Sequence, residues 1–211
     1  MFADRREAGR RLAEKLRHVT EENPLILGVP RGGVPVAREI YAALGGELDV
    51  IIPRKVGFPW HPELAAGAVT MEGGFILNQR LAENFGLTAA DLRPQIQAAQ
   101  AEIKHRMEVY RGQKPMPVIK DRTVIVADDG VATGFTIRAA LKALREQEAA
   151  QLILALPVIP AEPYAELKKI VDQLIYLAIP ADFLAVGQFY RDFSQLTDEQ
   201  VLKLLQEKDT R

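Results

Sequence analysis

The feature that most constrains the fold is an alternation, along almost the whole chain, of short apolar runs with segments of helical spacing. The apolar runs have the length of buried strands and lie at 24–29, 48–52, 123–127, 152–156 and 174–178. Strands that alternate with helices predict a parallel sheet. We therefore expect an α/β fold of three layers, in which an open parallel sheet carries helices on both faces.

The segments between these runs predict the outer layers. Helices are expected at 3–18, 36–44 and 88–111, from about 134 onwards, at 162–171 and from 198 to about 207. Thr88 is a candidate N-cap, and Thr197 and Gln200 have the spacing of a capping box. Because residues 123–127 are the most β-branched run, we expect them to form the central strand.

A long excursion interrupts the expected sheet at about 54–112. Its first part is rich in glycine and proline, which predicts a loop with little core of its own and a short hairpin turning at 72–74. We expect one domain over residues 1–211, with a hood at about 180–211. A chain of 211 residues buries roughly 70% of its unfolded surface, so no disulfide or metal is needed to stabilise its core.

Composition excludes several classes of function. The 27 basic and 28 acidic side chains give a net charge of −1, so nucleic acid and membrane surfaces are not expected partners. Cysteine is absent, which excludes disulfides and favours a cytoplasmic location. The N-terminus lacks the apolar stretch of a targeting segment, and the longest uncharged run, 149–161, is too short to cross a bilayer. A single serine and three scattered histidines offer no hydrolase elbow and no histidine metal motif.

Two adjacent acids, Asp128 and Asp129, follow the expected central strand directly. They therefore lie at the carboxyl end of the sheet, where open α/β folds bind ligands. The small-residue turn after them, with Gly130, Thr133 and Gly134, would point its backbone N–H groups and those of the next helix at a common centre, as in a phosphate cradle. The arrangement indicates a ligand with sugar hydroxyls for the acids and a phosphate for the loop.

Strand, DDGVATG and helix together resemble the phosphoribosyl-pyrophosphate (PRPP) motif of the type I phosphoribosyltransferases. The resemblance implies that Asp128 and Asp129 hold the ribose hydroxyls and, tentatively, a magnesium ion that is bound mainly by the ligand. It further implies a 5-phosphate site at the turn, lined by Gly130, Val131, Ala132, Thr133, Gly134 and Phe135.

Two other interpretations of this segment remain. One is a plain Asp-Gly turn after a buried strand. The other is a receiver domain, which would need an acceptor aspartate at the end of a later strand, whereas Asp172 precedes its strand. The ligand interpretation also requires that the carboxylates of Asp128 and Asp129 are not tied up in internal salt bridges.

The segment Arg31-Gly32-Gly33 follows the first expected strand. Glycine lets a backbone approach a diphosphate closely, and a guanidinium can chelate diphosphate oxygens. The segment resembles the pyrophosphate loop of the phosphoribosyltransferases, especially the RGG form of xanthine and related purine enzymes. The alternative is a simple turn from strand to helix.

A basic pair, Arg54 and Lys55, ends the second expected strand and has no acid nearby in the sequence, which suggests an anion as its partner; the alternative is an exposed pair on a loop. Phosphoribosyltransferases commonly have a lysine here and a mobile loop after it. The residues that would suit such a lid are Gly57, Pro59, Pro62 and Gly67, with Trp60 and His61 able to touch the substrate, although His61 alone is better explained as exposed.

The segment 181–196 is similar to the C-terminal segment of hypoxanthine-type enzymes, which contacts the base and the pyrophosphate. By position Val186, Gly187 and Arg191 would contact the base side of the ligand. The stretch between Gly187 and Arg191 is shorter than in those enzymes and lacks their aspartate, so the base is not specified. The alternative for the aromatic residues here is packing against the tail helix; they are Phe183, Phe189, Tyr190 and Phe193.

The resemblance implies transfer of a phosphoribosyl group from PRPP to a nucleobase or related heterocycle, with magnesium as cofactor and pyrophosphate as product. Arg31 and Lys55, with Asp128 and Asp129, are the expected catalytic residues, and Arg54 an additional phosphate contact. Two other functions remain open: a PRPP- or nucleotide-binding regulatory protein on the same fold, and an unrelated sugar-phosphate enzyme. Residues 77–111 match nothing in the family pattern and are expected to form a dimer surface or part of the lid, and a homodimer is expected.

Overall fold

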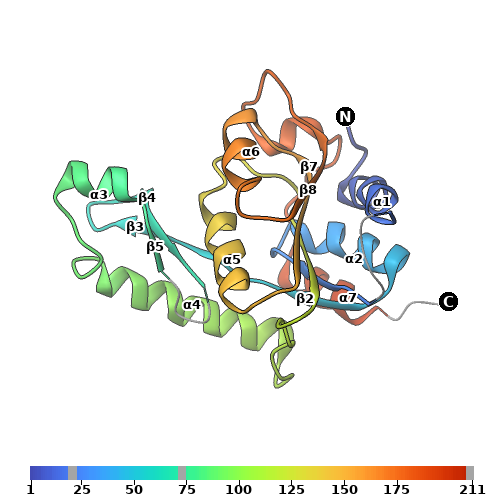
Figure 1. Ribbon diagram of the computed structural model, residues 1–211, viewed down its shortest axis with the longest axis horizontal. Coiled ribbons are helices and arrows are strands. Elements are labelled where there is room, and N and C mark those ends of the chain that lie inside the picture. Colours follow the sequence, from blue (N-terminus) through green and yellow to red (C-terminus); the bar gives the residue numbers. More distant parts are fainter. Residues whose placement is uncertain (19–22, 71–74, 208–211) are drawn as a thin grey trace.

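A computed structural model describes residues 1–18, 23–70 and 75–207 (Figure 1). Its main sheet has five strands in the order β2-β1-β6-β7-β8, and every neighbouring pair is parallel. The strands are β1 (Leu25–Gly28), β2 (Glu47–Val50), β6 (Thr123–Ala127), β7 (Gln151–Val158) and β8 (Gln173–Ala178). The most β-branched run, β6, is the central strand, as predicted.

Helices cover both faces of this sheet, so the predicted three-layer fold is confirmed. On one face α1 (Arg5–Leu16) and α2 (Gly33–Leu44) bury Leu12 and Ile40 against strand residues such as Ile125. On the other face α5 (Phe135–Glu146) and α6 (Ala161–Leu167) pack over strand residues of β6 and β7. Each face of the sheet therefore has its own apolar core. These two cores cover the faces of the sheet and not its carboxyl edge.

Local capping sets several helix boundaries. Asp4 is the N-cap of α1 and accepts a hydrogen bond from the backbone N–H of Glu7 at 2.7 Å. The predicted capping box is present at α7 (Asp198–Gln206), where Thr197 and Gln200 exchange hydrogen bonds. The expected helix at 88–111 begins later, because Thr88 is held in a separate turn by Asp91 and α4 spans Arg93–Arg111.

The excursion is a second small sheet with two helices, which projects from the main body (Figure 1). Its elements are β3 (Arg54–Phe58), β4 (His61–Val69), β5 (Phe75–Leu77), α3 (Gln79–Phe85) and α4. The prediction of a loop with little core was wrong, because Phe58, Ala66 and Leu92 are buried together within it. The predicted hairpin is β4 and β5, and its turn at 72–74 lies outside the described residues.

An ion pair and a shared apolar cluster help to join the excursion to the main sheet. Arg111 at the end of α4 forms a buried ion pair with Asp49 of β2. A shared apolar cluster joins α4, α7 and the ends of β2 and β3, with Ile103, Val201 and Val56 among its buried members. The tail helix therefore packs on the excursion and on α2. Within the described ranges, none of the helices combines the length and apolarity needed to cross a bilayer.

Candidate functional site at the carboxyl edge of the sheet

The two loops singled out in the sequence meet at the carboxyl edge, because β1 and β6 are adjacent strands. Asp128 and Asp129 follow β6, and Gly32 and Gly33 follow β1. A Cβ atom at Gly32 would lie 1.9 Å from Oδ2 of Asp129, and one at Gly33 would lie 2.5 Å from the carbonyl oxygen of Ala127. Only glycine therefore allows the Arg31-Gly32-Gly33 turn to lie this closely against the acid pair.

Burial and mutual repulsion shape the chemistry of the two acids. Burial raises the pKa of Asp128 well above its ordinary value, and the neighbouring charge of Asp129 raises it further. Burial also raises the pKa of Asp129, although Arg5 opposes that rise through a hydrogen bond and its positive charge. The pair therefore concentrates negative charge at an edge where part of that charge is unfavourable without a partner.

Arg5, in the first turn of α1, is a partner that the sequence did not reveal. Its Nε donates to Oδ2 of Asp129 at 2.7 Å, and both side chains are largely buried. The expectation that neither carboxylate takes part in an internal salt bridge was therefore wrong for Asp129. The hydroxyl of Tyr190 donates to the backbone carbonyl of Asp129 at 2.6 Å, a second contact that no motif indicated.

The turn after the acids has the predicted small-residue geometry. Gly130 and Gly134 have φ values of 151° and 71°, and Gly134 is the N-cap of α5. Ala132 and Thr133 are exposed, whereas Val131 is buried and Phe135 is half-buried beneath the guanidinium of Arg138. The turn is thus open to solvent at its centre.

Two backbone amides expected to face the ligand are engaged elsewhere. The N–H of Val131 donates to the carbonyl of Val158 at 3.2 Å, and the N–H of Gly33 donates to the carbonyl of Val29 at 2.8 Å. The Val131 N–H is therefore not free for the 5-phosphate expected at its turn, and the Gly33 N–H is not free for the diphosphate expected at the Arg31-Gly32-Gly33 turn. Parallel packing of β6 beside β7 explains the first case, and the turn from β1 into α2 explains the second.

The basic residues have different surroundings. Arg31 is exposed at the tip of its turn. Arg54 forms an ion pair with Glu102 of α4, so its partner in the structure is a carboxylate of the chain itself. Glu102 is far away in sequence, and only the folding of α4 onto β3 brings it to Arg54. Lys55 is exposed on β3, where it pairs in register with Ala68 of β4.

The C-terminal segment crosses the same edge. A Cβ atom at Gly130 would lie 2.6 Å from Cγ1 of Val186, so the base-side candidate Val186 packs directly on the turn after the acids. Gly187 lies against the ring of Phe193, and Arg191 is exposed. These residues belong to η1 (Val186–Phe189) and the stretch that follows it.

The aromatic residues of this segment pack on the N-terminus and on one another. Tyr190 stacks on Phe193 with ring centroids 5.0 Å apart and contacts Phe2 at 5.3 Å. Phe183 stacks on Phe189 at 5.8 Å. The alternative expectation, packing against the tail helix, was wrong, because α7 buries Val201 and Leu204 in a different cluster.

The proposed lid residues Trp60 and His61 lie in the excursion. Trp60 is 58% exposed and packs against Phe58 and Phe85, with centroid distances of 5.7 and 5.9 Å. His61 is exposed, and its Nδ1 accepts a hydrogen bond from the N–H of Leu64 at 3.2 Å. Both residues therefore lie where β3 turns into β4.

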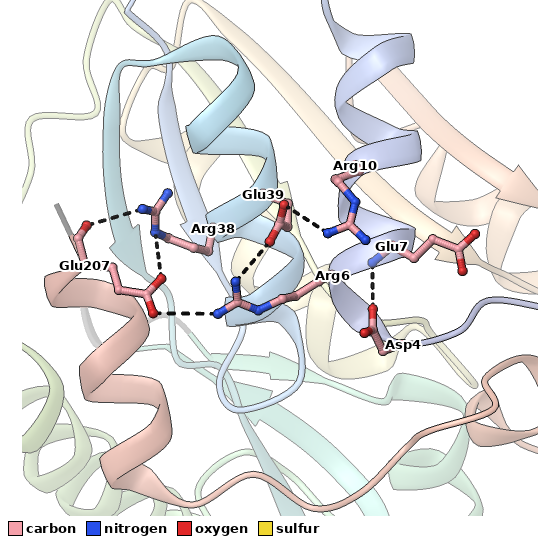
Figure 2. A network of polar contacts seen from close by, with 7 residues as sticks. All are labelled: Asp4, Arg6, Glu7, Arg10, Arg38, Glu39 and Glu207. Atoms are coloured by element: carbon pink, nitrogen blue, oxygen red, sulfur yellow. Dashed lines mark hydrogen bonds and ion pairs between the residues drawn. The ribbon is translucent and has the colours of Figure 1, made fainter. Parts of the chain in front are cut away.

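A cavity of about 330 Å³ lies beside the acid pair rather than on it. It is bounded by the start of α1, by α7 and by Asp192 and Ser194 of the C-terminal segment, and Arg5 is the residue it shares with the acids. Its lining residues Arg6 and Glu207 belong to an ion network, in which Arg6 joins Glu39 of α2 to Glu207 after α7 (Figure 2). The candidate site consists of the two acids and the two turns, which lie against each other at the carboxyl edge.

Comparison with known proteins decides the family. Residues 70–193, which include the acid pair and the turn after it, match the family described as "Phosphoribosyl transferase domain". The chain belongs to this family. The crystal structure of TT1426 from Thermus thermophilus is 40% identical in sequence, with a TM-score of 0.85 and 97% of each chain covered. A fold of the phosphoribosyl transferase type is thus established for the chain.

One longer curated relative and one solved structure with a similar fold extend the comparison. "Putative phosphoribosyl transferase Rv0571c" of Mycobacterium tuberculosis (strain ATCC 25618 / H37Rv) is 38% identical over 205 residues, which are 97% of this chain and 46% of that protein. The chain therefore spans about half the length of the curated relatives it matches. A hypothetical protein from Neisseria gonorrhoeae, crystallised with bound ppGpp, is 13% identical with a TM-score of 0.53, covers 95% and 90% of the two chains, and shows the shared fold.

Proposed function

We propose that this chain transfers the 5-phosphoribosyl group between PRPP and a nucleobase or related nitrogen heterocycle, with release of pyrophosphate. The observation that carries the proposal is the contact between Gly32 and Asp129, which brings a glycine turn suited to a diphosphate against an acid pair suited to sugar hydroxyls. A family match that spans the acid pair supports the same assignment.

Each part of the edge has a role in this proposal. The ribose hydroxyls donate hydrogen bonds to the carboxylates of Asp128 and Asp129. The 5-phosphate binds at the turn through residues 130–135, where Thr133 adds a hydroxyl donor. The diphosphate lies near Arg31 and the Gly32 amide, with Lys55 reaching it from β3. Arg54 has a lesser role than the sequence suggested, because Glu102 already neutralises it.

The reaction itself asks little covalent chemistry of the protein. The bond between C1 of the ribose and the pyrophosphate oxygen breaks with its electron pair leaving on the diphosphate, and a ring nitrogen of the base forms the new bond to C1. A proton carried by that nitrogen leaves to solvent. Positioning both reactants and stabilising the charge on the diphosphate, through Arg31 and Lys55, supply the rate enhancement.

The acid pair fits a magnesium ion that arrives with its ligand. Magnesium is usually held by one or two carboxylates together with phosphate oxygens and water. Asp128 and Asp129 provide two such carboxylates, and in the part of the chain that the structure describes no group of three or more potential ligands forms a complete metal site. When bound, the ion would neutralise charge on the diphosphate.

On the base side we place Val186, Gly187 and Arg191, since Val186 packs on the turn after the acids. The test of the whole proposal is incubation of the protein with PRPP, magnesium and a panel of purine and pyrimidine bases, with pyrophosphate release as the readout. Release that depends on one base supports transfer. Binding of PRPP without release under any base would contradict turnover and favour a regulatory role, and absence of PRPP binding would remove both.

A further inference from the structure

Arg5 is fixed against the acid pair by three groups. Its Nε donates to Oδ2 of Asp129 at 2.7 Å, its Nη1 donates to the carbonyl of Ser194 at 2.9 Å, and its guanidinium lies 3.9 Å from the ring centroid of Phe193. Only 12% of the Arg5 side chain is exposed. A guanidinium held in this way has one orientation, because releasing it would leave a largely buried charge without its partner.

The first residues of the chain and the segment after η1 hold Arg5 in place. The N–H of Phe2 donates to the carbonyl of Phe189 at 2.7 Å, and the N–H of Arg191 donates back to the carbonyl of Phe2 at 2.8 Å. The N–H of Asp192 donates to the carbonyl of Ala3 at 2.9 Å. We call residues 2–5 and 189–194 together the terminal clasp. It brings a cation from α1 to an acid 124 residues away in the sequence.

Arg5 occupies only part of the Asp129 carboxylate. It engages Asp129 through one nitrogen on one oxygen, whereas a guanidinium that blocks a carboxylate binds it as a fork with two nitrogens. A carboxylate has about four acceptor sites, and Nε occupies one of them. One further donor of the guanidinium is turned to Ser194 instead. Arg5 therefore pairs with Asp129 without blocking the rest of its carboxylate.

Arg5 offsets part of the repulsion between the two neighbouring acids. Asp128 and Asp129 are neighbours in sequence, and like charges placed together repel. The described structure brings Arg5 to them from α1, together with the hydroxyl of Tyr190 on the backbone of Asp129. With Arg5 present, one cation offsets part of the charge of two acids and fixes the side chain of Asp129.

We propose that Arg5 is a positioning residue for the sugar, which holds Asp129 so that the remaining acceptor sites of the acid pair meet the ribose hydroxyls. The inference deepens the proposed function and rests on it. Arg5 acts on the substrate through Asp129, so its effect is confined to ligands that carry the ribose. Pyrophosphate, which would bind at the Arg31-Gly32-Gly33 turn, does not depend on it.

The test compares dissociation constants, measured by calorimetry with magnesium, for PRPP, ribose 5-phosphate and pyrophosphate. Arg5→Gln should weaken PRPP and ribose 5-phosphate about ten- to hundredfold, because a displaced Asp129 loses a charged hydrogen bond to the ribose, and should leave pyrophosphate within about twofold. Arg5→Lys keeps the charge and should recover part of the loss. Arg6→Gln, a matched loss of charge on the same helix turn, should bind all three ligands as the wild type does.

A second variant separates positioning from a general loosening of the clasp. Phe2→Leu disturbs the same two segments without touching Asp129, and thermal unfolding shows how far each variant is destabilised. If Phe2→Leu and Arg5→Gln lose PRPP affinity in proportion to their lost stability, the role of Arg5 is only structural and the proposal is wrong. Tighter PRPP binding by Arg5→Gln would show that Arg5 blocks the Asp129 carboxylate, and this result would also overturn the proposal.

The outcome for the wild type distinguishes this inference from the function on which it rests. Wild-type protein that binds neither PRPP nor ribose 5-phosphate removes the proposed function, and the role of Arg5 with it. Wild-type protein that binds PRPP while Arg5→Gln binds it equally well removes the role of Arg5 alone.

Discussion

Two Asp–Arg pairs in this molecule have similar geometry and opposite surroundings. Arg111 and Asp49 join α4 to β2, with Nε 2.8 and 3.0 Å from the two carboxylate oxygens and side chains 6% and 11% exposed. Arg5 and Asp129 join α1 to the carboxyl edge at 2.7 Å, with side chains 12% and 14% exposed. Each pair links segments far apart in sequence, but the Arg5–Asp129 pair lies at the carboxyl edge of the sheet, where we propose that the ligand binds.

The difference lies in what surrounds each acid. Asp49 is matched one to one by Arg111, and the guanidinium is satisfied further by the carbonyl of Pro115. Asp129 has a second acid beside it and a glycine turn against its Oδ2, so one cation serves two carboxylates. We call the Arg111–Asp49 pair complete, because one cation matches one acid, and it stabilises the fold. We call the Arg5–Asp129 pair incomplete, because one cation faces two acids and the remaining negative charge can interact with the proposed ligand.

Removing the cation of the complete pair should have the largest effect on stability. Arg111→Ala leaves Asp49 buried without its partner, which costs about 3–5 kcal/mol. Urea unfolding of the wild type and the variant measures the change. Arg122→Gln is the matched control, because its pair with Glu47 is more exposed, at 27% and 46%, and should cost less than about 1 kcal/mol. Equal losses for the two variants would contradict the structural role assigned to the Arg111 pair.

The incomplete pair should show its effect in binding instead. Asp128→Asn combined with Asp129→Asn removes the charge that accepts the ribose hydroxyls, and we expect at least a hundredfold loss of PRPP affinity by calorimetry. Each charged hydrogen bond lost accounts for roughly tenfold or more. Glu14→Gln, at an exposed acid on α1, controls for net charge and should bind as the wild type does. PRPP binding that survives the double substitution would remove the acids from the site.

The sequence predicted the two acids and the glycine turn better than it predicted Arg5, the cation that pairs with them. Asp128, Asp129 and the Arg31-Gly32-Gly33 turn follow apolar runs, and adjacent parallel strands bring such loops to one edge whatever the rest of the chain does. Arg5 could not be predicted, because it lies in a helix whose charges look solvent-exposed and its partner is distant in sequence. Contacts of this kind exist only after the N-terminal residues meet the segment 189–194.

The excursion was harder to predict for a related reason. A register shift between Val56 and Gly57 interrupts the β3–β4 pairing, so the alternation that identifies a strand is broken. The helix α3 is only seven residues long, too short for a clear helical period. The pairing of Arg54 with Glu102 depends on both elements being in place.

A smaller effect is expected where the glycine turn meets the acid. Gly32 has an ordinary helical φ of −66°, so Gly32→Ala adds no backbone strain, but its Cβ would lie 1.9 Å from Oδ2 of Asp129. We expect a loss of about 1–3 kcal/mol in urea unfolding and a weaker PRPP complex. Gly112→Ala, which has a φ of 59° and open space around its Cβ, tests backbone strain alone and should leave PRPP binding unchanged. PRPP affinity that is unaltered by Gly32→Ala would show that the contact has no role in binding.

The smallest expected effect is a pH-dependent change in stability when a single acid, Asp128 or Asp49, is replaced by asparagine. Burial and the charge of Asp129 raise the pKa of Asp128 in the folded protein above its unfolded value of about 3.8. The folded state therefore holds the proton more tightly, and this acid lowers stability as pH rises from about 3.8 through its folded pKa. Asp128→Asn removes that penalty and keeps the acceptor oxygen for the N–H of Asp129. We expect the free energy of unfolding of the variant to match that of the wild type near pH 4 and to exceed it at neutral pH by on the order of 1 kcal/mol.

Asp49→Asn should instead lower the free energy of unfolding at neutral pH, because it removes the negative charge that pairs with Arg111. Urea unfolding across this pH range measures both, and a loss of stability at neutral pH in Asp128→Asn would mean that this acid, like Asp49, belongs to the structure and not to the ligand.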